Sequence, residues 1–215
     1  NLDETEKKTL GGIGLENGQA DLMIENSLGT FELPLGVAVN FLINDQDYLI
    51  PMAVEEPSVL AAVSHAAKLF RAGGGFQTEA SDPVMIGQIQ VLDLPDMDAA
   101  VAAIEANKQV LMAQADLWDP SSVKCGGGAR DSVARPFPDT PVGPMLIVHL
   151  YFDTRDAMGA NAINSAVEAL APVVADLTGG RTSLRILSNL ADHRVATARG
   201  TIPAEMLETH GIPGK

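Results

Sequence analysis

Short β-rich runs give way to a helical spacing of apolar positions in the first third of the chain. Two β-rich runs, residues 37–43 and 48–54, flank the turn-forming segment 44–47, which is typical of a β-hairpin. Pro57 then stands where a first helical residue would be, and apolar residues follow at helical spacing as far as Gly73. The pattern predicts a hairpin followed by a helix.

The middle of the chain alternates β-rich runs with helical patterns. Their order, β-α-β-β-α-β, is that of the ferredoxin-like split βαβ unit. The predicted elements are a strand over 84–92, an Ala-rich amphipathic helix from Asp96 to about Gln114, a strand over 123–133 interrupted by Gly126-Gly127-Gly128, a buried strand over 145–152, a helix from Gly159 to about Leu177 disturbed at Pro172, and, after Gly179-Gly180, a closing strand over 183–187.

This order predicts an α+β protein in which one module interrupts another domain. Residues 1–82 would form the first part of a large α/β domain, residues 83–188 the inserted ferredoxin-like module, and residues 189–215 the return to the large domain. The chain begins with Asn1 and ends in the loop-like segment 210–215, so we expect both ends to be truncated.

Composition indicates an ordinary folded protein with an excess of acidic residues. Hydrophobic residues make up 46% of the chain, and 14 Lys and Arg against 28 Asp and Glu give a formal net charge of −14. Such acidity argues against DNA or RNA as a partner, because phosphate contacts need clustered basic side chains. An anionic ligand would have to be held locally, by backbone NH groups and a few basic residues.

Three features predict a soluble, cytoplasmic protein. Cys125 is the only cysteine, so no intrachain disulfide can form, which fits a reducing compartment. The N-terminal residues are acidic and lack the basic and apolar regions of a signal peptide. The longest apolar stretch, residues 146–152, is far too short to span a membrane. No membrane partner is expected.

The segment 155–161, Arg-Asp-Ala-Met-Gly-Ala-Asn, lies between a predicted buried strand and a predicted helix. Free backbone NH groups and the positive helix end can meet phosphate oxygens there, and the small residues let a ligand approach closely. A structural alternative is equally open at this point. Asp156 could simply cap the helix while the small residues pack under a neighbouring element.

The adjacent carboxylates of Glu55 and Glu56 stand just before the predicted helix at Pro57. Acidic residues favour a helix N-terminus, and a purely structural role as a cap is the simpler interpretation. Adjacent carboxylates can also raise one another's pKa, and a carboxyl group held near neutrality can act as a general acid. The sequence alone does not decide between the two.

The histidines and the cysteine give no sign of a metal or nucleophile site. His65, His149, His193 and His210 lack metal-ligand spacing, so no metal is expected. His149 lies in an apolar strand and is expected to be a hydrogen-bonded core residue. Cys125 fits a core or loop thiol better than a nucleophile.

Several longer motifs, taken together, resemble those of one family. They are Glu25-Asn26-Ser27-Leu28-Gly29-Thr30, residues 33–38 (LPLGVA), residues 48–58 (YLIPMAVEEPS), His149 separated by six residues from Asp156-Ala157-Met158-Gly159-Ala160-Asn161, and residues 185–192 (RILSNLAD). In these motifs the chain resembles the class II, bacterial-type 3-hydroxy-3-methylglutaryl-CoA (HMG-CoA) reductases over nearly its whole length. The resemblance implies a large substrate-binding domain with an inserted ferredoxin-like NAD(P)-binding domain.

The resemblance also implies roles for individual residues. Glu56 matches the catalytic glutamate, which exchanges a proton with the substrate oxygen, and Ser58 and Asn189 match positions that contact the hydroxymethylglutaryl or mevalonate portion. Asp119 falls where NAD-using members hold an acidic residue. Because a carboxylate accepts a hydrogen bond from a ribose hydroxyl and repels a 2′-phosphate, NAD is expected in preference to NADP. The residues implied to hold the dinucleotide are Asp156, Ala157, Met158, Gly159, Ala160 and Asn161.

The reaction implied is the two-step reduction of the HMG-CoA thioester to mevalonate and CoA, or its reverse. In the family a lysine, an aspartate and a histidine share this chemistry with the glutamate, and we expect all three beyond Lys215. The chain as given should therefore be inactive. Residues 25–29 resemble a dimer-contact region, so a homodimer or higher homo-oligomer of the complete protein is expected.

Two other classes of function stay open on the sequence. A ferredoxin-like module that binds a small anion without chemistry would use Glu55 and Glu56 only as a helix cap. Another CoA-thioester enzyme, such as a transferase, would need no dinucleotide loop. The physiological direction, synthesis or breakdown of mevalonate, is open as well.

Overall fold

The chain folds into two compact units. The computed structural model describes residues 3–11, 14–53 and 56–208. The first unit combines Asn1–Thr78 with Ala198–Lys215, and the second is Glu79–Thr197.

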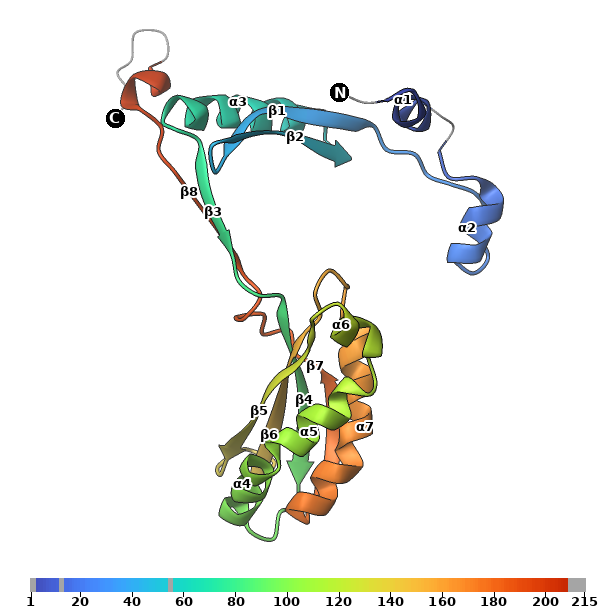
Figure 1. The fold of residues 1–215 in the computed structure, drawn as a ribbon, viewed down its shortest axis with the longest axis vertical. Helices are drawn as coiled ribbons and strands as arrows, with labels where there is room; N and C mark the ends of the chain where they lie inside the picture. Colours follow the sequence, from blue (N-terminus) through green and yellow to red (C-terminus); the bar gives the residue numbers. More distant parts are fainter. Residues whose placement is uncertain (1–2, 12–13, 54–55, 209–215) are drawn as a thin grey trace. The chain divides into compact units, whose positions relative to one another are not determined.

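The first unit is built around a four-stranded sheet with the strand order β2-β1-β3-β8 (Figure 1). Its elements are the helices α1 (Glu4–Leu10), α2 (Asn17–Met23) and α3 (Pro57–Ala72), the strands β1 (Leu35–Ile43), β2 (Gln46–Ala53), β3 (Phe76–Ala80) and β8 (Ala196–Gly200), and the 3-10 helix η1 (Ala204–Leu207). β3 and β8 carry the chain into the second unit and back.

The predicted hairpin and helix of this unit are confirmed. β1 and β2 pair antiparallel through a two-residue turn, Asn44-Asp45, whose residues both have positive φ angles, 48° and 64°. Such turns match the twist of paired strands, and Asn and Asp tolerate the left-handed region. α3 begins at Pro57 as predicted, and the ring of Phe70 near its end lies 4.6 Å from that of Phe76.

The second unit has the predicted ferredoxin-like order of elements, with a four-stranded sheet ordered β5-β6-β4-β7. Every pair of neighbouring strands in it is antiparallel. Its elements are β4 (Val84–Leu92), α4 (Met97–Ala106), α5 (Lys108–Asp116), α6 (Pro120–Lys124), β5 (Gly128–Phe137), β6 (Met145–Asp153), α7 (Ala160–Thr178) and β7 (Arg181–Leu187). The fold class is therefore α+β.

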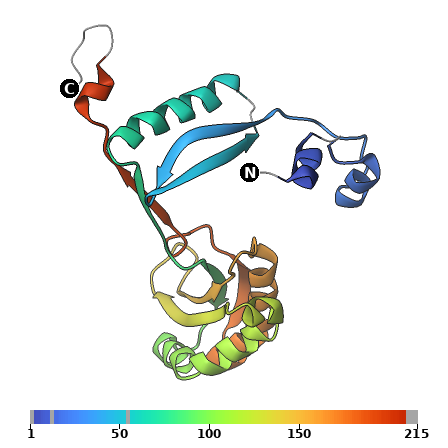
Figure 2. The same ribbon diagram turned by 45° about the horizontal axis from the view of Figure 1, so that its top comes forward.

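The core of the second unit lies between one face of this sheet and its long helices. α4, α5 and α7 cover the same face of the sheet (Figures 1 and 2). Alternate residues of β6, among them Val148, Leu150 and Phe152, meet Ile163 and Val167 of α7 in one buried cluster. Each such side chain contributes about 1.5–3 kcal/mol on burial. This packing fixes where β6 ends and α7 begins, and so positions the turn between them.

The predicted helix from Asp96 to about Gln114 is wrong in one respect, because it is divided at Asn107 into α4 and α5. Asn107 has φ −108° and ψ 14°, outside the helical region, and its Nδ2 donates to the carbonyl oxygen of Ala103 at 2.8 Å. An Asn side chain that bonds a nearby backbone group competes with the helix. The apolar periodicity continues across the break, so it does not reveal it.

The predicted strand over 123–133 is wrong in its first half, because residues 120–124 form α6 and β5 begins only at Gly128. Asp119 caps α6 and Pro120 occupies its first position, a combination that starts a helix. α7 runs through Pro172 without ending there. Burial of the adjacent Leu170, Ala171 and Val174 holds that face of α7 against the sheet.

The two ends of the second unit are joined to each other. The amide of Ser81 donates to the carbonyl oxygen of Val195 at 3.0 Å, and the amide of Val195 donates to the hydroxyl of Ser81 at 3.0 Å. That hydroxyl in turn donates to the carbonyl oxygen of His193 at 2.9 Å. The predicted module 83–188 lies wholly within this unit, and residues 189–197 also belong to it.

Candidate cofactor and substrate sites

The turn between β6 and α7 is the first candidate site. Arg155 has a positive φ of 49°, and the amide of Ala157 donates to the carbonyl oxygen of Thr154 at 3.0 Å. α7 is capped by Gly159, at φ 86°, and no side chain caps it. The alternative in which Asp156 caps the helix is therefore wrong, because the Asp156 side chain is exposed and stands outside the cap.

The side chains of the turn leave its backbone accessible. Asp156, Ala157, Met158 and Asn161 are exposed, and Gly159 is buried with Thr154 and Met85 beneath it. Ala160 is half-buried at the first position of the helix. The helix behind this turn is 19 residues long, so its dipole is fully developed at the uncapped end.

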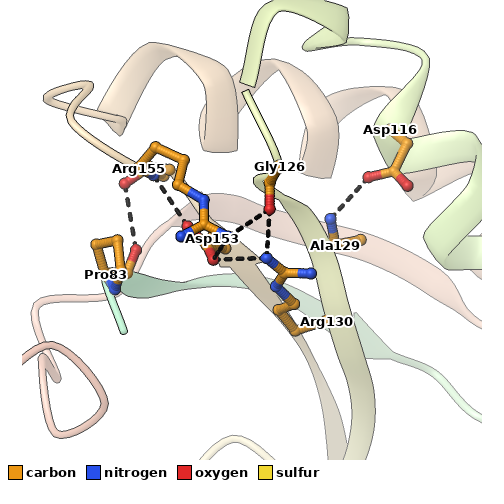
Figure 3. A network of polar contacts seen from close by, with 8 residues as sticks. Pro83, Asp116, Gly126, Ala129, Arg130, Asp153 and Arg155 are labelled. Carbon is orange, nitrogen blue, oxygen red and sulfur yellow. Dashed lines mark hydrogen bonds and ion pairs between the residues drawn. The ribbon is translucent and has the colours of Figure 1, made fainter. Parts of the chain in front are cut away.

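Basic side chains surround the turn although the chain as a whole is acidic. The guanidinium groups of Arg130 and Arg155 both pair with the carboxylate of Asp153, at 2.7 and 3.4 Å (Figure 3). Arg194 adds a third, since its Nη1 lies 3.2 Å from Oγ1 of Thr154. Burial would raise the pKa of Asp153, but the hydrogen bonds from Arg130 and the Arg155 amide, with the two charges, outweigh it and lower that pKa.

Asp119 lies on a segment that packs against this turn. Its carboxylate accepts the amide of Ser122 at 3.1 Å and also the Ser122 hydroxyl, so both oxygens take part in capping α6. The amide of Gly127 donates to the carbonyl oxygen of Ser122 at 2.8 Å. Gly127 approaches the backbone of Asp153 so closely that an added Cβ would lie 2.5 Å from the Asp153 carbonyl oxygen. Within the second unit, the segment of Asp119 and the β6–α7 turn are thus neighbours.

Glu56 and Ser58 form the second candidate site, in the first unit. Glu56 is the N-cap of α3, where its carboxylate accepts the Ser58 amide at 3.1 Å and the Ser58 hydroxyl. These two hydrogen bonds, the hydroxyl first, lower the pKa of the exposed Glu56 carboxyl group. A raised pKa, which adjacent carboxylates can cause, is therefore not found at Glu56. Glu55 lies outside the described residues.

Asn189 follows β7 in the second unit. Its side chain is exposed, and the neighbouring Ser188 anchors the segment by donating its amide to the carbonyl oxygen of Ile86 at 2.7 Å. Glu56 and Ser58 belong to the first unit and Asn189 to the second, so each of these substrate-site candidates is described within its own unit.

His149 differs from the hydrogen-bonded core residue that the sequence predicts. It is buried in β6, but its Nδ1 has no hydrogen-bond partner in the described part of the chain. Burial, followed by the positive charge of Arg135, lowers its pKa, and Asp192 opposes this in part. Its ring lies 6.2 Å from that of Tyr151, which in turn lies 4.9 Å from that of His193. His210 lies outside the described residues.

The segment around Glu25–Gly29 presents apolar side chains to solvent. Leu28 is fully exposed and Phe31 is 90% exposed, while Asn26 and Gly29 have positive φ angles. No helix in the described ranges is both long and apolar enough to cross a membrane. Nor do three or more His, Cys, Asp or Glu side chains gather as metal ligands among residues 3–11, 14–53 and 56–208.

Sequence reasoning missed three residues that shape the turn, namely Arg130, Asp153 and Arg194. Each acts across the fold, since Arg130 and Asp153 are 23 positions apart and Arg194 and Thr154 are 40 apart. One signal was present. Asp153 directly follows an apolar strand, and a carboxylate at such a place needs partners.

Fold and site together define an α+β protein whose ferredoxin-like unit interrupts a second unit and carries a basic strand-to-helix turn without a side-chain cap. Residues 1–212 match the family described as hydroxymethylglutaryl-coenzyme A reductase, and the chain belongs to this family. The resemblance to the HMG-CoA reductases is thereby confirmed.

Individual relatives agree with this assignment. The chain is 49% identical over 206 residues to the 3-hydroxy-3-methylglutaryl-coenzyme A reductase of Archaeoglobus fulgidus, covering 96% of this chain and 47% of that protein. It superposes with a TM-score of 0.89 on the Streptococcus pneumoniae reductase, at 36% identity, covering 96% of this chain and 49% of that one. A class II S. pneumoniae structure bound to NADPH in open conformations gives the same TM-score at 35% identity, covering 96% and 50%. The chain spans about half the length of these relatives.

Proposed function

We propose that this chain forms the dinucleotide-binding part, and a portion of the substrate site, of an enzyme that interconverts HMG-CoA with mevalonate and CoA. The observation that carries the proposal is the family match over residues 1–212, which includes both candidate sites in order. The fold alone would not suffice, because ferredoxin-like units serve many functions.

The β6–α7 turn fits the diphosphate of a nicotinamide dinucleotide. Its helix end carries no side-chain cap, Arg130 and Arg155 are partly exposed beside it, and the buried Nε of Arg155 has no partner among the described residues. In a chain of net charge −14, this local excess of basic groups favours an anion. The backbone from Asp156 to Asn161 is proposed to hold the diphosphate.

Asp119 is proposed to favour NAD over NADP. Its carboxylate already accepts two hydrogen bonds from Ser122, but an ionised carboxylate offers about four acceptor positions, so a ribose hydroxyl can still bind it. A 2′-phosphate would be repelled. The related S. pneumoniae enzyme binds NADPH, so measured kcat/KM values for NADH and NADPH decide the point. Strong NADPH selectivity would contradict the proposed role of Asp119.

Each dinucleotide, when bound, would supply one hydride, so two dinucleotide molecules used in succession would take the thioester to the alcohol. The residues of this chain are proposed to orient the substrate, with the Ser58 hydroxyl and the Asn189 amide on its hydroxymethylglutaryl or mevalonate portion. Glu56 exchanges a proton with the substrate oxygen. Because the Ser58 hydrogen bonds lower its pKa, Glu56 must lose them or become desolvated before it can hold a proton near neutral pH.

The lysine, aspartate and histidine that share this chemistry in the family have no match in the 215 residues. We therefore propose that these residues alone bind the dinucleotide without turnover, and that the complete protein acts as a homodimer or larger homo-oligomer. Binding is measured by the fluorescence of NADH, and turnover by NADH formation from NAD, mevalonate and CoA.

The complete protein should show both binding and turnover, and the 215-residue chain only binding. Binding without turnover by the complete protein would favour a non-catalytic anion-binding module. Absence of dinucleotide binding, together with CoA transfer, would favour a transferase. Turnover by the 215-residue chain would contradict the proposed division of the active site.

A further inference from the structure

Asp153 is a buried carboxylate placed between the two segments of the proposed dinucleotide site. Only 1% of its side chain is exposed, and it ends β6. Its Oδ1 accepts the amide of Arg155 at 3.0 Å, and its Oδ2 accepts Nη2 of Arg130 at 2.7 Å (Figure 3). One carboxylate therefore bonds both to the turn before α7 and to β5, the strand that follows the glycine loop Gly126-Gly127-Gly128.

The hydrogen bond to the Arg155 amide supports a backbone that is unfavourable for an arginine. Arg155 has φ 49°, in the left-handed region that glycine adopts readily and other residues rarely do. The turn that leads to Asp156–Asn161 depends on this angle. The hydrogen bond from the Arg155 amide to Asp153 compensates the cost of this φ angle.

The two arginines that Asp153 orients also hold the glycine loop. Nη2 of Arg130 and Nη2 of Arg155 donate to the carbonyl oxygen of Gly126, at 2.7 and 2.5 Å (Figure 3). Gly126 and Gly128 have positive φ angles of 84° and 105°, so this loop has wide conformational freedom when it is not held. The loop joins directly to α6, which Asp119 caps.

The loop has other attachments as well, including the pairing of Gly128 with Asp153 at the end of the β5–β6 ladder. The carboxylate of Asp116 accepts the amide of Ala129 at 2.7 Å, which ties the loop to α5 (Figure 3). The carbonyl oxygen of Ser122 accepts the amide of Gly127 at 2.8 Å, which ties it to α6. Among the hydrogen bonds of the described residues, those of Arg130 and Arg155 link Gly126 to the β6–α7 turn, and Asp153 orients both side chains.

We infer that Asp153 is a positioning residue for the dinucleotide, which sets the spacing between the segment of Asp119 and the turn Asp156–Asn161. The inference rests on the proposed function, since it assigns those two segments to one ligand. Without the Asp153 charge, the backbone pairing of β5 with β6 remains, but both segments lose the side-chain anchor that they share and the dinucleotide binds less tightly. The reacting groups are elsewhere, so turnover at saturating dinucleotide is preserved.

The test is Asp153→Asn in the complete protein, with Asp93→Asn as the matched control. Asp93 also pairs with an arginine of the second unit, Arg181, at 2.9 Å, but neither belongs to these segments. For Asp153→Asn we expect the KM for the dinucleotide to rise about tenfold or more, with kcat and the KM for HMG-CoA within about twofold, a change of roughly 1.4 kcal/mol in binding. The control should leave all three constants unchanged.

Coupling to Arg130 separates a positioning role from general damage. If Asp153 acts through Arg130, the effects of Asp153→Asn and Arg130→Gln on the KM for the dinucleotide should be non-additive in the double variant. The double variant is charge-neutral and takes the place of Asp153→Asn if that protein does not fold. Its KM for the dinucleotide should also be raised about tenfold.

Three outcomes would overturn the inference. An unchanged KM for the dinucleotide in a folded variant removes the positioning role. A fall in kcat together with a rise in the KM for both substrates removes it as well. Failure of the unsubstituted complete protein to bind NADH or NADPH overturns the proposed function as well. Binding by the unsubstituted protein with no effect of Asp153→Asn overturns this inference alone.

Discussion

Glu56 shows how one carboxylate can have a structural and a chemical role at once. In the first unit it is the N-cap of α3, and its hydrogen bonds to Ser58 lower its pKa. The proposed chemistry needs the same group to carry a proton. A cap and a general acid differ in what is lost when the charge is removed.

Glu56→Gln in the complete protein should lower kcat by about 10²- to 10⁴-fold, as expected when a general acid is removed. The midpoint of unfolding should change little, because Glu56 is exposed. The matched control is Asp96→Asn, since Asp96 caps α4 through the amide of Ala99 at 3.0 Å and lies in no candidate site. Steady-state rates and urea unfolding measure the two effects. Equal kcat values for both variants would favour the cap alone.

His149 should make the stability of the second unit depend on pH. Burial lowers its pKa in the folded state below the unfolded value of about 6.5, so the folded state binds fewer protons as the pH falls through that value. The free energy of unfolding should therefore fall on acidification from pH 7.5 to pH 5.5, by at most about 1.4 kcal/mol, because pH 5.5 is one unit below the unfolded pKa. Stability from this residue is complete above pH 6.5.

His149→Gln should reduce that dependence, as measured by urea unfolding at the two pH values. His193→Gln is the control, because the His193 ring contacts that of Tyr151 edge to face but is half-exposed. A pH dependence unchanged by His149→Gln would show that the buried imidazole is not its source.

At the scale of elements, the sequence predicts the strands and helices that follow from the spacing of apolar residues. It misses the features that depend on a single side-chain hydrogen bond. The apolar residues along the sequence predict the strands 84–92 and 145–152 and the helix that begins at Pro57. The break at Asn107 depends on one side-chain bond to Ala103 and leaves the apolar spacing intact.

The same distinction applies to the candidate sites. The strand-to-helix turn and the Glu56 cap could be predicted because their residues are adjacent in the sequence. The arginines around Asp153 could not, because they come from separate elements. The assignment of individual roles to Ser58, Asn189 and Asp119 came from the family resemblance and remains a prediction.

Gly127→Ala should destabilise the second unit. An added Cβ would lie 2.5 Å from the carbonyl oxygen of Asp153 and 3.0 Å from that of Ser122, both backbone atoms that cannot move aside cheaply. Overpacking of this kind costs about 1–3 kcal/mol. Gly18→Ala is the control, since nothing lies within 4 Å of the added Cβ, and it should be neutral or slightly stabilising. Urea unfolding compares them, and equal stability of the two variants would contradict the close approach.

At the scale of the whole molecule, the chain carries about half of the length of its relatives, and apolar side chains of the first unit face solvent. Leu28 in the segment Glu25–Gly29 is fully exposed, and this segment is the contact proposed for self-association. Contacts of that kind bury apolar groups that a single chain leaves open.

Leu28→Asp should weaken self-association of the complete protein, because a charge would be buried in the contact. Light scattering after gel filtration should show a shift from dimer towards monomer at micromolar concentration. Leu117→Asp is the control, since Leu117 is 76% exposed in the second unit and lies outside that segment. An unchanged mass for Leu28→Asp would argue against this segment as the contact.

The hydrogen bonds between Ser81 and Val195 bear on how such a protein can arise. A segment whose entry and exit lie side by side can be spliced into a tight turn of another protein at little entropic cost, because its own fold already closes the loop. Residues 79–197 therefore have the geometry of a domain that can be inserted into another protein. A single recombination event could add it to a host protein or remove it, and a circularly permuted version should fold with its new ends elsewhere on the surface.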